Sequence, residues 1–279
     1  YSKIKIMNSN SNIFLKKKIL IYGLGKSGLA TYDFLKKKNK VFLYDDYKKN
    51  LKNFINFKKV KKIKFDYIII SPGINIRNCK LSKFLKTYSN KIFTDLDVFF
   101  SFFNNDCITV TGTNGKSTTC QLLYEILLKQ KFDVRLVGNI GNPILSLRKI
   151  KPKTIFVVEA SSYQLEYSKI FKSKFAAILN ISPDHIERHK TIKRYVSAKF
   201  KLLKHQSKNS LCFVKKNDSF IKKGLKFTKI KSKVIKIDTN KNNRLIHYQK
   251  NKYFLTEANK ENLLFVLSII KKFKINKQL

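Results

Sequence analysis

Arginine and acidic residues are scarce in this 279-residue sequence, although its net charge is high. Six of the 60 basic residues are arginine, and the 17 acidic residues leave a formal net charge of +43. The lysines are spread over the whole chain, whereas a nucleic-acid site is expected to be local, to contain arginine and to include stacking aromatic residues. We therefore predict no specific nucleic-acid partner. The competing hypothesis, a basic nucleic-acid-binding protein, depends on the net charge alone.

Cysteine and long apolar runs are scarce as well. The four cysteines are scattered without a Cys-x-x-Cys pair, a pattern that favours reduced, packed thiols over disulfides or a zinc site. No apolar run approaches the roughly 20 residues that a membrane-spanning helix needs. Residues 1–18 lack the apolar segment and the cleavage site of a signal peptide. We expect a cytoplasmic protein that does not enter a membrane.

Hydrophobic residues, by contrast, make up 43% of the chain and include 23 phenylalanines, enough for packed cores in two domains. Short apolar runs predict buried strands at 18–22, 40–44, 66–71, 91–94, 108–111, 133–137, 154–158 and 175–180. Apolar periodicity predicts helices at 29–37, 95–103, 116–128, 160–166, 192–205 and 259–273. Short alternating segments predict an antiparallel edge or flap over 210–255. We thus predict an α/β fold, with a domain boundary near residues 104–105 and an irregular segment over 1–17.

One stretch combines a strand, a glycine-bounded loop and a helix. The β-branched run 108–111 is followed by Gly112-Thr-Asn-Gly115 and then by Lys116, Ser117 and Thr118. Backbone N–H groups of such a loop can turn inward on an anion, and the helix N-terminus adds partial positive charge. In a phosphate-binding loop, the lysine reaches the outer phosphates and the serine places a hydroxyl on Mg²⁺. Two residues separate the glycines instead of the four of the generic motif, so an ordinary strand–turn–helix is the alternative.

A second glycine-rich turn lies near the N-terminus. Gly23-Leu-Gly-Lys-Ser-Gly28 follows the first predicted strand, and Asp45 ends the second strand about 20 residues later. Strand, GxGxxG, helix, strand and acid match the dinucleotide-binding fingerprint, in which Asp45 would contact a ribose. Taken alone this indicates NAD(P), although any nucleotide diphosphate can use the same turn. Ser71-Pro-Gly73 ends the third strand, at the edge where parallel sheets bind ligands.

Acidic and histidine residues follow the later strands. Glu159 ends the strand 154–158, where a carboxylate in the same sheet as a phosphate loop is suited to bind Mg²⁺; the alternative is a helix N-cap. His185 and His189 are four residues apart, a spacing that suggests zinc. The metalloprotease signature places glutamate directly after the first histidine, whereas Glu187 comes two residues later. We therefore predict no protease site.

Together these motifs resemble the Mur ligases and their folylpolyglutamate synthase relatives. The loop 111–118 is similar to that family's ATP loop, and four further motifs follow in the family's order: Gly138-Asn-Ile-Gly141, Glu159-Ala-Ser-Ser-Tyr-Gln164, Asn180 to His185, and Ala198-Lys199. Gly23 to Ala30, Ser71-Pro-Gly73 and Asp184 to His189 resemble the branch that adds D-glutamate. The resemblance covers residues 18–275. It implies a Rossmann-like N-terminal domain over 18–103, a P-loop-type α/β ATPase central domain over 104–279, and a third α/β domain that this chain lacks.

The resemblance implies roles for individual residues. It implies binding of the UDP part of a sugar substrate, not NAD, around Leu24, Lys26, Ser27, Asp45, Ser71 and Gly73, and further substrate contacts at Asn139, Ser161 and Gln164. It implies ATP contacts at Gly112, Thr113, Asn114, Gly115, Lys116, Ser117, Thr118, Asn259 and Asn262. It implies two Mg²⁺ ions, one on Ser117 and Glu159 and one on His185 and a carbamylated Lys199, with Lys116, His185 and Lys199 catalytic. From the residues alone, however, Lys199 is a surface lysine and the two asparagines lie on a helix face. Asp46 and Tyr47 replace the Thr-Arg that often follows the family's aspartate.

The implied reaction is the ATP-dependent addition of D-glutamate to UDP-N-acetylmuramoyl-L-alanine through an acyl phosphate, in peptidoglycan precursor synthesis and by a monomer. In the family the third domain binds D-glutamate and completes the ATP site. We therefore expect a fragment, a truncated product or a decayed enzyme that folds but does not ligate alone. The alternatives are a sister ligase for another amino acid and a non-catalytic nucleotide-binding remnant.

Overall fold

The computed structural model describes residues 12–48, 51–239 and 256–273. The chain forms two compact units and passes between them after residues 104, 141, 150, 165 and 171. The first unit contains the residues up to 104 together with 142–150 and 166–171, and the second contains the rest. The domain boundary near residues 104–105, which assumes a single passage, stays a prediction.

The first unit is built on a four-stranded parallel sheet in the order β2-β1-β3-β4. Its strands are β1 (Lys18–Tyr22), β2 (Lys40–Tyr44), β3 (Tyr67–Ile70) and β4 (Ile92–Phe93). Its helices are α1 (Lys26–Leu35), α2 (Phe57–Lys62), α3 (Ser82–Thr87) and α4 (Asp95–Phe102), with the short 3-10 helices η1 (Ser89–Lys91) and η2 (Ile144–Ser146). The strands are nearly continuous apolar runs because helices cover both faces of a parallel sheet.

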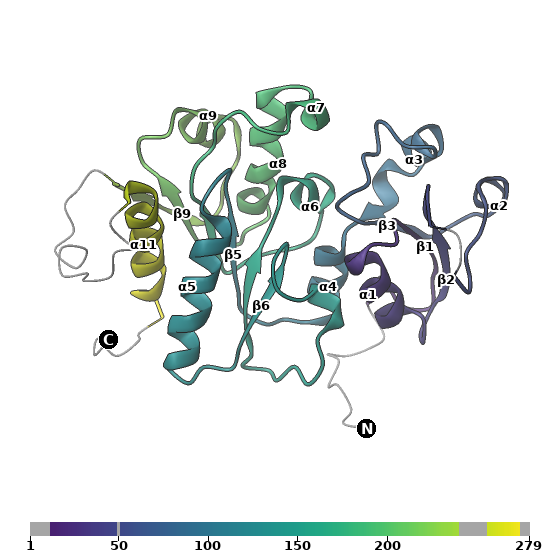
Figure 1. Cartoon of the computed structure of the whole chain (residues 1–279), viewed down its shortest axis with the longest axis horizontal. Helices are drawn as coiled ribbons and strands as arrows, with labels where there is room; N and C mark the ends of the chain where they lie inside the picture. The colour runs from purple at the N-terminus through teal and green to yellow at the C-terminus, as the bar shows by residue number, and fades with distance from the viewer. Residues whose placement is uncertain (1–11, 49–50, 240–255, 274–279) are drawn as a thin grey trace. The chain divides into compact units, whose positions relative to one another are not determined.

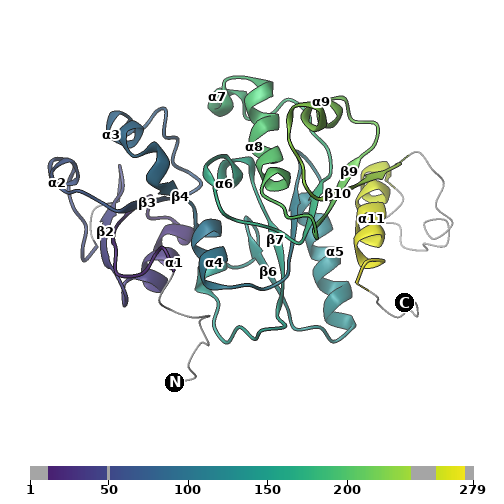
Figure 2. The same ribbon diagram turned by 180° about the vertical axis from the view of Figure 1, so that it is seen from behind.

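The second unit is built on a six-stranded parallel sheet in the order β10-β9-β8-β5-β7-β6. Its strands are β5 (Cys107–Thr111), β6 (Val134–Gly138), β7 (Ile155–Glu159), β8 (Phe175–Ile178), β9 (Leu211–Lys215) and β10 (Lys233–Ile237). Its helices are α5 (Lys116–Lys129), α7 (Ile186–His189), α8 (Ile192–Lys204), α9 (Ser219–Phe227) and α11 (Glu257–Ile270), and α6 (Ser162–Tyr167) begins in it. Helices α5 and α11 lie side by side on one face, and α8 and α9 lie on the other (Figure 1 and Figure 2). The two parallel sheets confirm the predicted α/β class.

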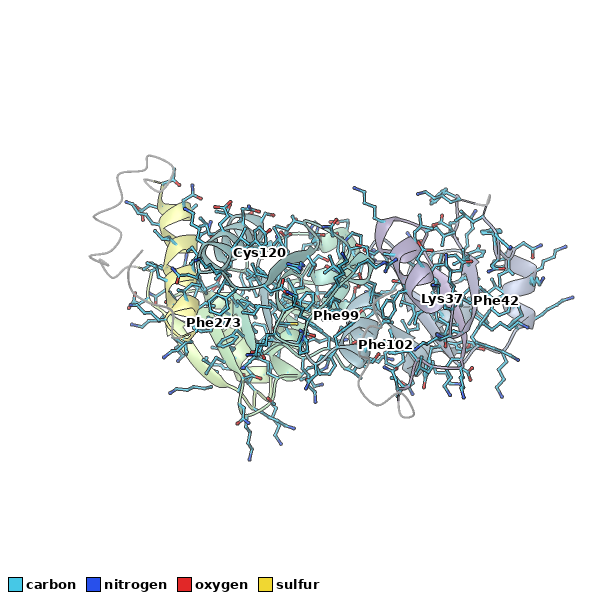
Figure 3. All side chains as sticks on the ribbon, turned by 90° about the horizontal axis from the view of Figure 1, so that it is seen from below. Lys37, Phe42, Phe99, Phe102, Cys120 and Phe273 are labelled. Atoms are coloured by element: carbon cyan, nitrogen blue, oxygen red, sulfur yellow. The ribbon has the colours of Figure 1, made fainter. Side chains whose placement is uncertain are left out.

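The core of the second unit lies between its sheet and the helices α5 and α11. Ile108 and Val110 of β5 pack there with Leu123 of α5 and Phe265 of α11. Figure 3 labels Cys120, a further member of this core on α5, and Phe273, which is partly buried and packs against the core with its ring centroid 4.6 Å from that of Phe175. All four cysteines are free, and Cys107, Cys120 and Cys212 are buried, which confirms the predicted packed thiols.

The structure contradicts the antiparallel edge or flap predicted over 210–255, as far as residue 239. β9 pairs in parallel with β8, and β10 pairs in parallel with β9. The Asn217-Asp218 pair is not a hairpin turn, because Asp218 accepts a hydrogen bond from the backbone N of Ile221 and so caps α9. That helix is the crossover that a parallel pair needs. The remaining residues of the prediction, 240–255, lie outside the described residues.

Smaller differences concern the helices. α1 begins at Lys26, three residues before its predicted start, and α11 begins at Glu257, two residues early, behind the N-cap Thr256. The short helices α2, α3 and α7 were not predicted, because four to six residues are too few to display an apolar period. Among the described residues, no helix combines the length and the apolar composition needed to cross a membrane.

One carboxylate fastens the segment 166–171 to the rest of the first unit. Asp97, which is fully buried in α4, accepts hydrogen bonds at Oδ2 from the backbone N and the hydroxyl of Thr94, in a capping box. Its Oδ1 accepts from the Ser168 hydroxyl at 2.9 Å and from the backbone N of residues 169, 170 and 171 at 2.9, 2.9 and 3.0 Å. A buried carboxylate with this many donors is a strong tether.

Candidate active site

The loop between β5 and α5 has the geometry of an anion-binding turn. Gly115 precedes α5 with φ +80°, in the left-handed region that favours glycine. A Cβ at this position would overlap the side chain of Asn262. Lys116, the first residue of α5, donates from Nζ to the carbonyl O of Thr113 at 2.8 Å. The loop therefore brings an ammonium group to the N-terminus of a 14-residue helix, a combination suited to a phosphate group.

Residues that follow β8 hold this loop in place. The backbone N of Thr113 donates to the Asn180 carbonyl at 3.0 Å, and the backbone N of Asn114 donates to Asn180 Oδ1 at 2.9 Å. Thr113 Oγ1 accepts from the backbone N of Ser182 at 3.0 Å and lies 3.1 Å from the Tyr195 hydroxyl. β5 and β8 are neighbours in the sheet, and the helices α5 and α8 that follow them lie on opposite faces (Figure 1 and Figure 2). Parallel sheets bind ligands at such a point.

Glu159 is a buried carboxylate at the end of β7, with 1% of its surface exposed. Its Oε2 accepts from the Ser117 hydroxyl at 2.8 Å, and its Oε1 accepts from Asn139 Nδ2 at 2.8 Å. The helix N-cap alternative for Glu159 is wrong, because Ser161 Oγ accepts the hydrogen bond from the backbone N of Gln164 in α6. Three segments that are distant in the sequence thus meet at one carboxylate beside the loop.

Lys199 lies on the buried face of α8, with 1% of its surface exposed, so the surface-lysine alternative is wrong. Its Nζ donates to the carbonyl O of Gly112 at 2.7 Å and lies 4.5 Å from the centre of the Tyr195 ring. Burial lowers the pKa of Lys199 to about 7; the charge of Lys116 acts in the same direction and that of Asp184 opposes it. A substantial fraction of this side chain is therefore a neutral amine at neutral pH.

This pKa predicts a pH dependence of stability. The unfolded chain holds the Lys199 proton up to the ordinary pKa of 10.5, whereas the folded chain releases it near 7. The folded state therefore gains stability as the pH rises through this window, and loses it as the pH falls toward 7. Between pH 7 and pH 10.5, we expect the free energy of unfolding of the wild type to rise by about 3–5 kcal/mol more than that of a Lys199→Met variant, which has no group that titrates there.

Urea unfolding at several pH values across this window, in bicarbonate-free buffer, measures the difference. Lys204→Met is the matched control, since Lys204 is exposed on the same helix. Parallel curves of unfolding free energy against pH for the wild type and Lys199→Met would contradict the prediction.

The predicted ligand His185 and its neighbour in the zinc-like spacing, His189, lie against one tyrosine. The rings of His185 and His189 are centred 4.9 and 5.7 Å from the Tyr163 ring. His185 is 44% exposed, and its Nε2 lies 3.4 Å from Asp184 Oδ2. His189 is buried, and its Nε2 lies 3.0 Å from the Ser162 hydroxyl. His185 also contacts the Tyr195 ring on which Lys199 lies, with ring centroids 6.3 Å apart.

The other predicted contacts of the second unit are distributed around the loop. Gln164 is buried, and its Oε1 accepts from the backbone N and the hydroxyl of Ser161 at 3.1 and 3.2 Å. Asn262 is buried against Gly115, whereas Asn259, one turn earlier on α11, is partly exposed. Thr118 lies in the first turn of α5.

The predicted contacts of the first unit gather at the carboxyl ends of β1, β2 and β3. Asp45 accepts from the backbone N of Leu24 at 2.7 Å and from those of Tyr47 and Lys48 at 2.9 and 3.0 Å. Desolvation raises the pKa of Asp45, but these hydrogen bonds outweigh it and leave the pKa below its ordinary value. Ser71 Oγ donates to the Gly23 carbonyl at 2.6 Å. Asp45 and Ser71 thus shape the glycine turn as well as facing it.

Two side chains near the glycine turn, Asp46 and Ser27, have hydrogen-bond partners within the first unit. Asp46, which departs from the family pattern, accepts from the Tyr22 hydroxyl at 2.9 Å, and Tyr47 is 88% exposed. Ser27 hydrogen-bonds to the buried Asp95; desolvation raises the pKa of Asp95 to about 6. Lys26 and Gly73 are exposed. The Lys26 side chain is therefore open to solvent, whereas the Ser27 hydroxyl is engaged by Asp95.

The sequence did not identify Asn180 and Tyr195 as residues that hold the loop between β5 and α5. A signal for Tyr195 was present, because it precedes Lys199 by one helical turn and both residues lie on the face of α8 that carries its apolar side chains. Asn180 follows the strand paired with β5, and only knowledge of that pairing places it beside the loop.

Comparison with known proteins agrees with this geometry. A family model described as the Mur ligase middle domain matches residues 110–277. The UDP-N-acetylmuramoylalanine–D-glutamate ligase of Rickettsia bellii is 36% identical over 208 residues, which are 71% of this chain and 46% of the relative. The enzyme of the same name from Elusimicrobium minutum is 37% identical over 242 residues, 80% of this chain and 53% of the relative. The chain spans about half the length of the curated relatives it matches.

Solved structures share the fold at low sequence identity. The UDP-N-acetylmuramate:L-alanyl-gamma-D-glutamyl-meso-diaminopimelate ligase from Neisseria meningitides matches 93% of this chain and 94% of its own, with a TM-score of 0.60 and 15% identity. The MurF ligase from Thermotoga maritima, in complex with ADP, matches 95% of this chain and 65% of its own, with a TM-score of 0.51 and 13% identity. Since the family model covers more than half of the sequence and the fold agrees, the chain belongs to the Mur ligase family.

Proposed function

We propose that this chain provides the UDP-substrate and ATP sites of a ligase that joins D-glutamate to UDP-N-acetylmuramoyl-L-alanine. The observation that carries the ATP-dependent chemistry is the meeting of Ser117 and Asn139 on the buried carboxylate of Glu159, beside the Gly112–Lys116 loop. The names of relatives at 36 and 37% identity support the choice of substrates. We place the UDP-substrate domain at residues 18–103 and the ATP-binding domain at 104–279, in a cytoplasmic monomer.

The proposed reaction activates a carboxylate before an amine attacks it. A carboxylate oxygen of the L-alanyl group attacks the γ-phosphorus of ATP, which releases ADP and leaves an acyl phosphate. The amine of D-glutamate then attacks the carbonyl carbon, an amide bond forms, inorganic phosphate leaves and the amine nitrogen loses a proton. Lys116 would neutralise charge on the transferring phosphoryl group. Asn259 and Asn262 would contact the adenine, and Asn139, Ser161 and Gln164 would orient the substrate.

The donor set around Glu159 fits a magnesium ion. Glu159 and Ser117 offer a carboxylate and a hydroxyl oxygen, and Mg²⁺ commonly takes one or two protein ligands and completes its shell with water and substrate phosphate. Bound there, Mg²⁺ would supply positive charge to phosphate oxygens. Among the described residues, no cluster of three or more histidine, cysteine or acidic side chains offers a metal site made by protein alone.

A second ion on His185 and Lys199 requires a modified lysine. The Lys199 amine donates a hydrogen bond to Gly112, so as it stands it is not a ligand. We propose that it reacts with CO₂, forming a carbamate and releasing a proton, which replaces the amine with an oxygen ligand. The lowered pKa supports this step, because only the neutral amine is nucleophilic.

The first-unit site is tested by its choice of ligand. We expect the chain to bind UDP-N-acetylmuramoyl-L-alanine at least about tenfold more tightly than NAD⁺ or NADH, by isothermal titration calorimetry. Lys26→Ala removes an exposed ammonium beside the glycine turn and should weaken binding of the UDP compound about 5- to 30-fold, as expected for a charge-assisted contact to a diphosphate.

Lys36→Ala is the matched control for this test, because Lys36 lies just beyond α1 and pairs with Asp33 instead. It should bind the UDP compound within twofold of the wild type. Tighter binding of NAD(H) than of the UDP compound would instead assign a dinucleotide to this unit and refute the proposed substrate.

A further inference from the structure

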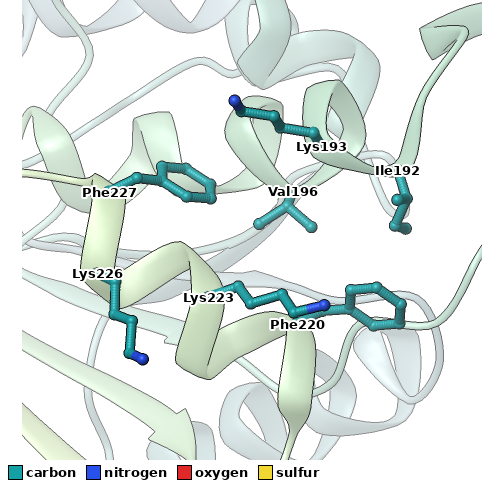
Figure 4. Close-up of a pocket in the computed structure, with 7 residues that line it drawn as sticks. All are labelled: Ile192, Lys193, Val196, Phe220, Lys223, Lys226 and Phe227. Carbon is teal, nitrogen blue, oxygen red and sulfur yellow. The ribbon is translucent and has the colours of Figure 1, made fainter.

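A pocket of about 450 Å³ lies between α8 and α9, and none of its lining residues belongs to the site described above. Its apolar lining comes from Ile192 and Val196 of α8 and from Phe220 and Phe227 of α9. In Figure 4 the side chains of Val196, Phe227 and Ile192 point into this space. The volume falls within the range of roughly 300–1,000 Å³ found for small-molecule sites.

The two helices approach closely at one point beside the pocket. Gly224 of α9 lies against the ring of Phe200, where a Cβ would overlap its ring carbons. The Phe227 ring lies 6.1 Å from that of Phe200, yet Phe227 remains 47% exposed. Phe220, two turns earlier on α9, is also only partly buried. Two large aromatic side chains therefore line the pocket, and the described residues leave part of the surface of each exposed.

Three lysines complete the lining: Lys193, Lys223 and Lys226. None of the lining residues is acidic. Lys223 Nζ lies 5.6 Å from the centre of the Phe220 ring, so one ammonium is held directly over the apolar wall. The first turn of α8, a 13-residue helix, contributes Ile192 and Lys193, and the positive end of its dipole favours an anion at the same place.

We propose that this pocket binds a soluble, single-chain anionic amphiphile: an alkyl chain that ends in a carboxylate. The alkyl chain would occupy the space between Val196, Phe220 and Phe227, and the carboxylate would lie beside Lys223. Lysines occur over the whole surface of this chain, so charge alone does not distinguish the site. The site is distinguished by its apolar walls together with the ammonium over them, because a purely polar anion gains nothing from the aromatic walls.

The test uses decanoate below its micelle concentration and the full 279-residue chain. Methyl NMR follows Ile192 and Val196, which line the pocket. We expect their signals to shift saturably with decanoate. Decanol, which lacks the charge, should bind at least threefold more weakly, and inorganic phosphate, which lacks the chain, should leave these signals unchanged.

Two matched pairs of exposed variants separate the pocket from non-specific attraction. Lys223→Ser should weaken decanoate binding about two- to fivefold, the range for an exposed ion pair, whereas Lys222→Ser, on the same helix but outside the pocket, should change it less. Phe227→Ser should weaken it about fivefold or more through lost apolar contact. Leu128→Ser, at an equally exposed apolar side chain on α5, should have no effect.

Several outcomes would overturn the proposal. Unshifted Ile192 and Val196 signals would exclude the pocket as the binding site. Equal losses in Lys222→Ser and Lys223→Ser would show non-specific attraction to a basic chain. A response to vesicles of anionic lipid without one to monomeric decanoate would assign the surface to a membrane instead. None of these variants touches the proposed ATP or UDP site, so the result is independent of the ligase proposal.

Discussion

Replacing Glu159 with glutamine is expected to reduce the affinity of the chain for Mg·ATP at least about 100-fold. At an effective dielectric constant of about 20, two unit charges 4 Å apart interact by roughly 4 kcal/mol, and a divalent ion doubles the charge on one side. Glutamine has nearly the same shape but no charge. Its amide NH₂ would also face a donor, either the Ser117 hydroxyl or Asn139 Nδ2, both of which now donate to the carboxylate.

The measurement is calorimetric titration of ATP with and without Mg²⁺. For the wild type we expect Mg²⁺ to strengthen ATP binding, and for Glu159→Gln we expect this gain to disappear. Glu125→Gln is the matched control, because Glu125 is an exposed acid on α5 that pairs with Gln121 and lies away from the loop. An undiminished effect of Mg²⁺ on the Glu159→Gln variant would place the ion elsewhere and remove the main support for the proposed site.

Asp97→Asn is expected to lower the free energy of unfolding by about 3–5 kcal/mol, the range for breaking a buried, charged hydrogen-bond network. An asparagine has one oxygen for the donors that now share two. In one orientation of the amide, the NH₂ group faces the backbone N and the hydroxyl of Thr94. In the other orientation, it faces the Ser168 hydroxyl and the backbone N–H groups of residues 169–171. An unsatisfied buried donor costs its full desolvation free energy.

Circular dichroism during urea unfolding gives the change, and hydrogen exchange at Ile19–Tyr22 shows whether it falls on the first unit. Asp33→Asn is the control, since Asp33 is exposed and pairs with Lys36, and surface changes of this kind stay within about 0.5 kcal/mol. An Asp97→Asn variant as stable as this control would show that backbone contacts alone hold the segment 166–171.

The fold class was predictable because the strands of both sheets share one sequence pattern. Runs such as Ile19–Tyr22 and Phe156–Val158 are apolar without alternation, which is typical of strands covered on both faces, and a glycine turn follows the first of them. α9 was not predictable in this way. The Asn217-Asp218 pair at its start is equally typical of a turn. Only the parallel pairing of β10 with β9 requires a crossover helix between them.

The candidate site was predictable in its parts but not in its burial. The glycine loop and Glu159 follow from their positions at the ends of strands, which needs no knowledge of distant contacts. The environment of Lys199 depends on Gly112 and Tyr195, and the distance between Lys199 and Gly112 along the chain is too long for any local pattern to connect them. The resemblance to a family suggested that Lys199 is important. The structure shows what sets it apart physically: its amine is desolvated and lies in the field of another lysine, Lys116.

The repeated passage of the chain between its two units has a consequence for biosynthesis. The four strands of the first sheet are synthesised early, but the segment that donates to the Asp97 carboxylate is synthesised only after three strands of the second sheet. Until residue 171 is available, a buried acid stands without most of its donors. We therefore expect the N-terminal unit to complete its buried hydrogen bonds only after β5, β6 and β7 have been synthesised.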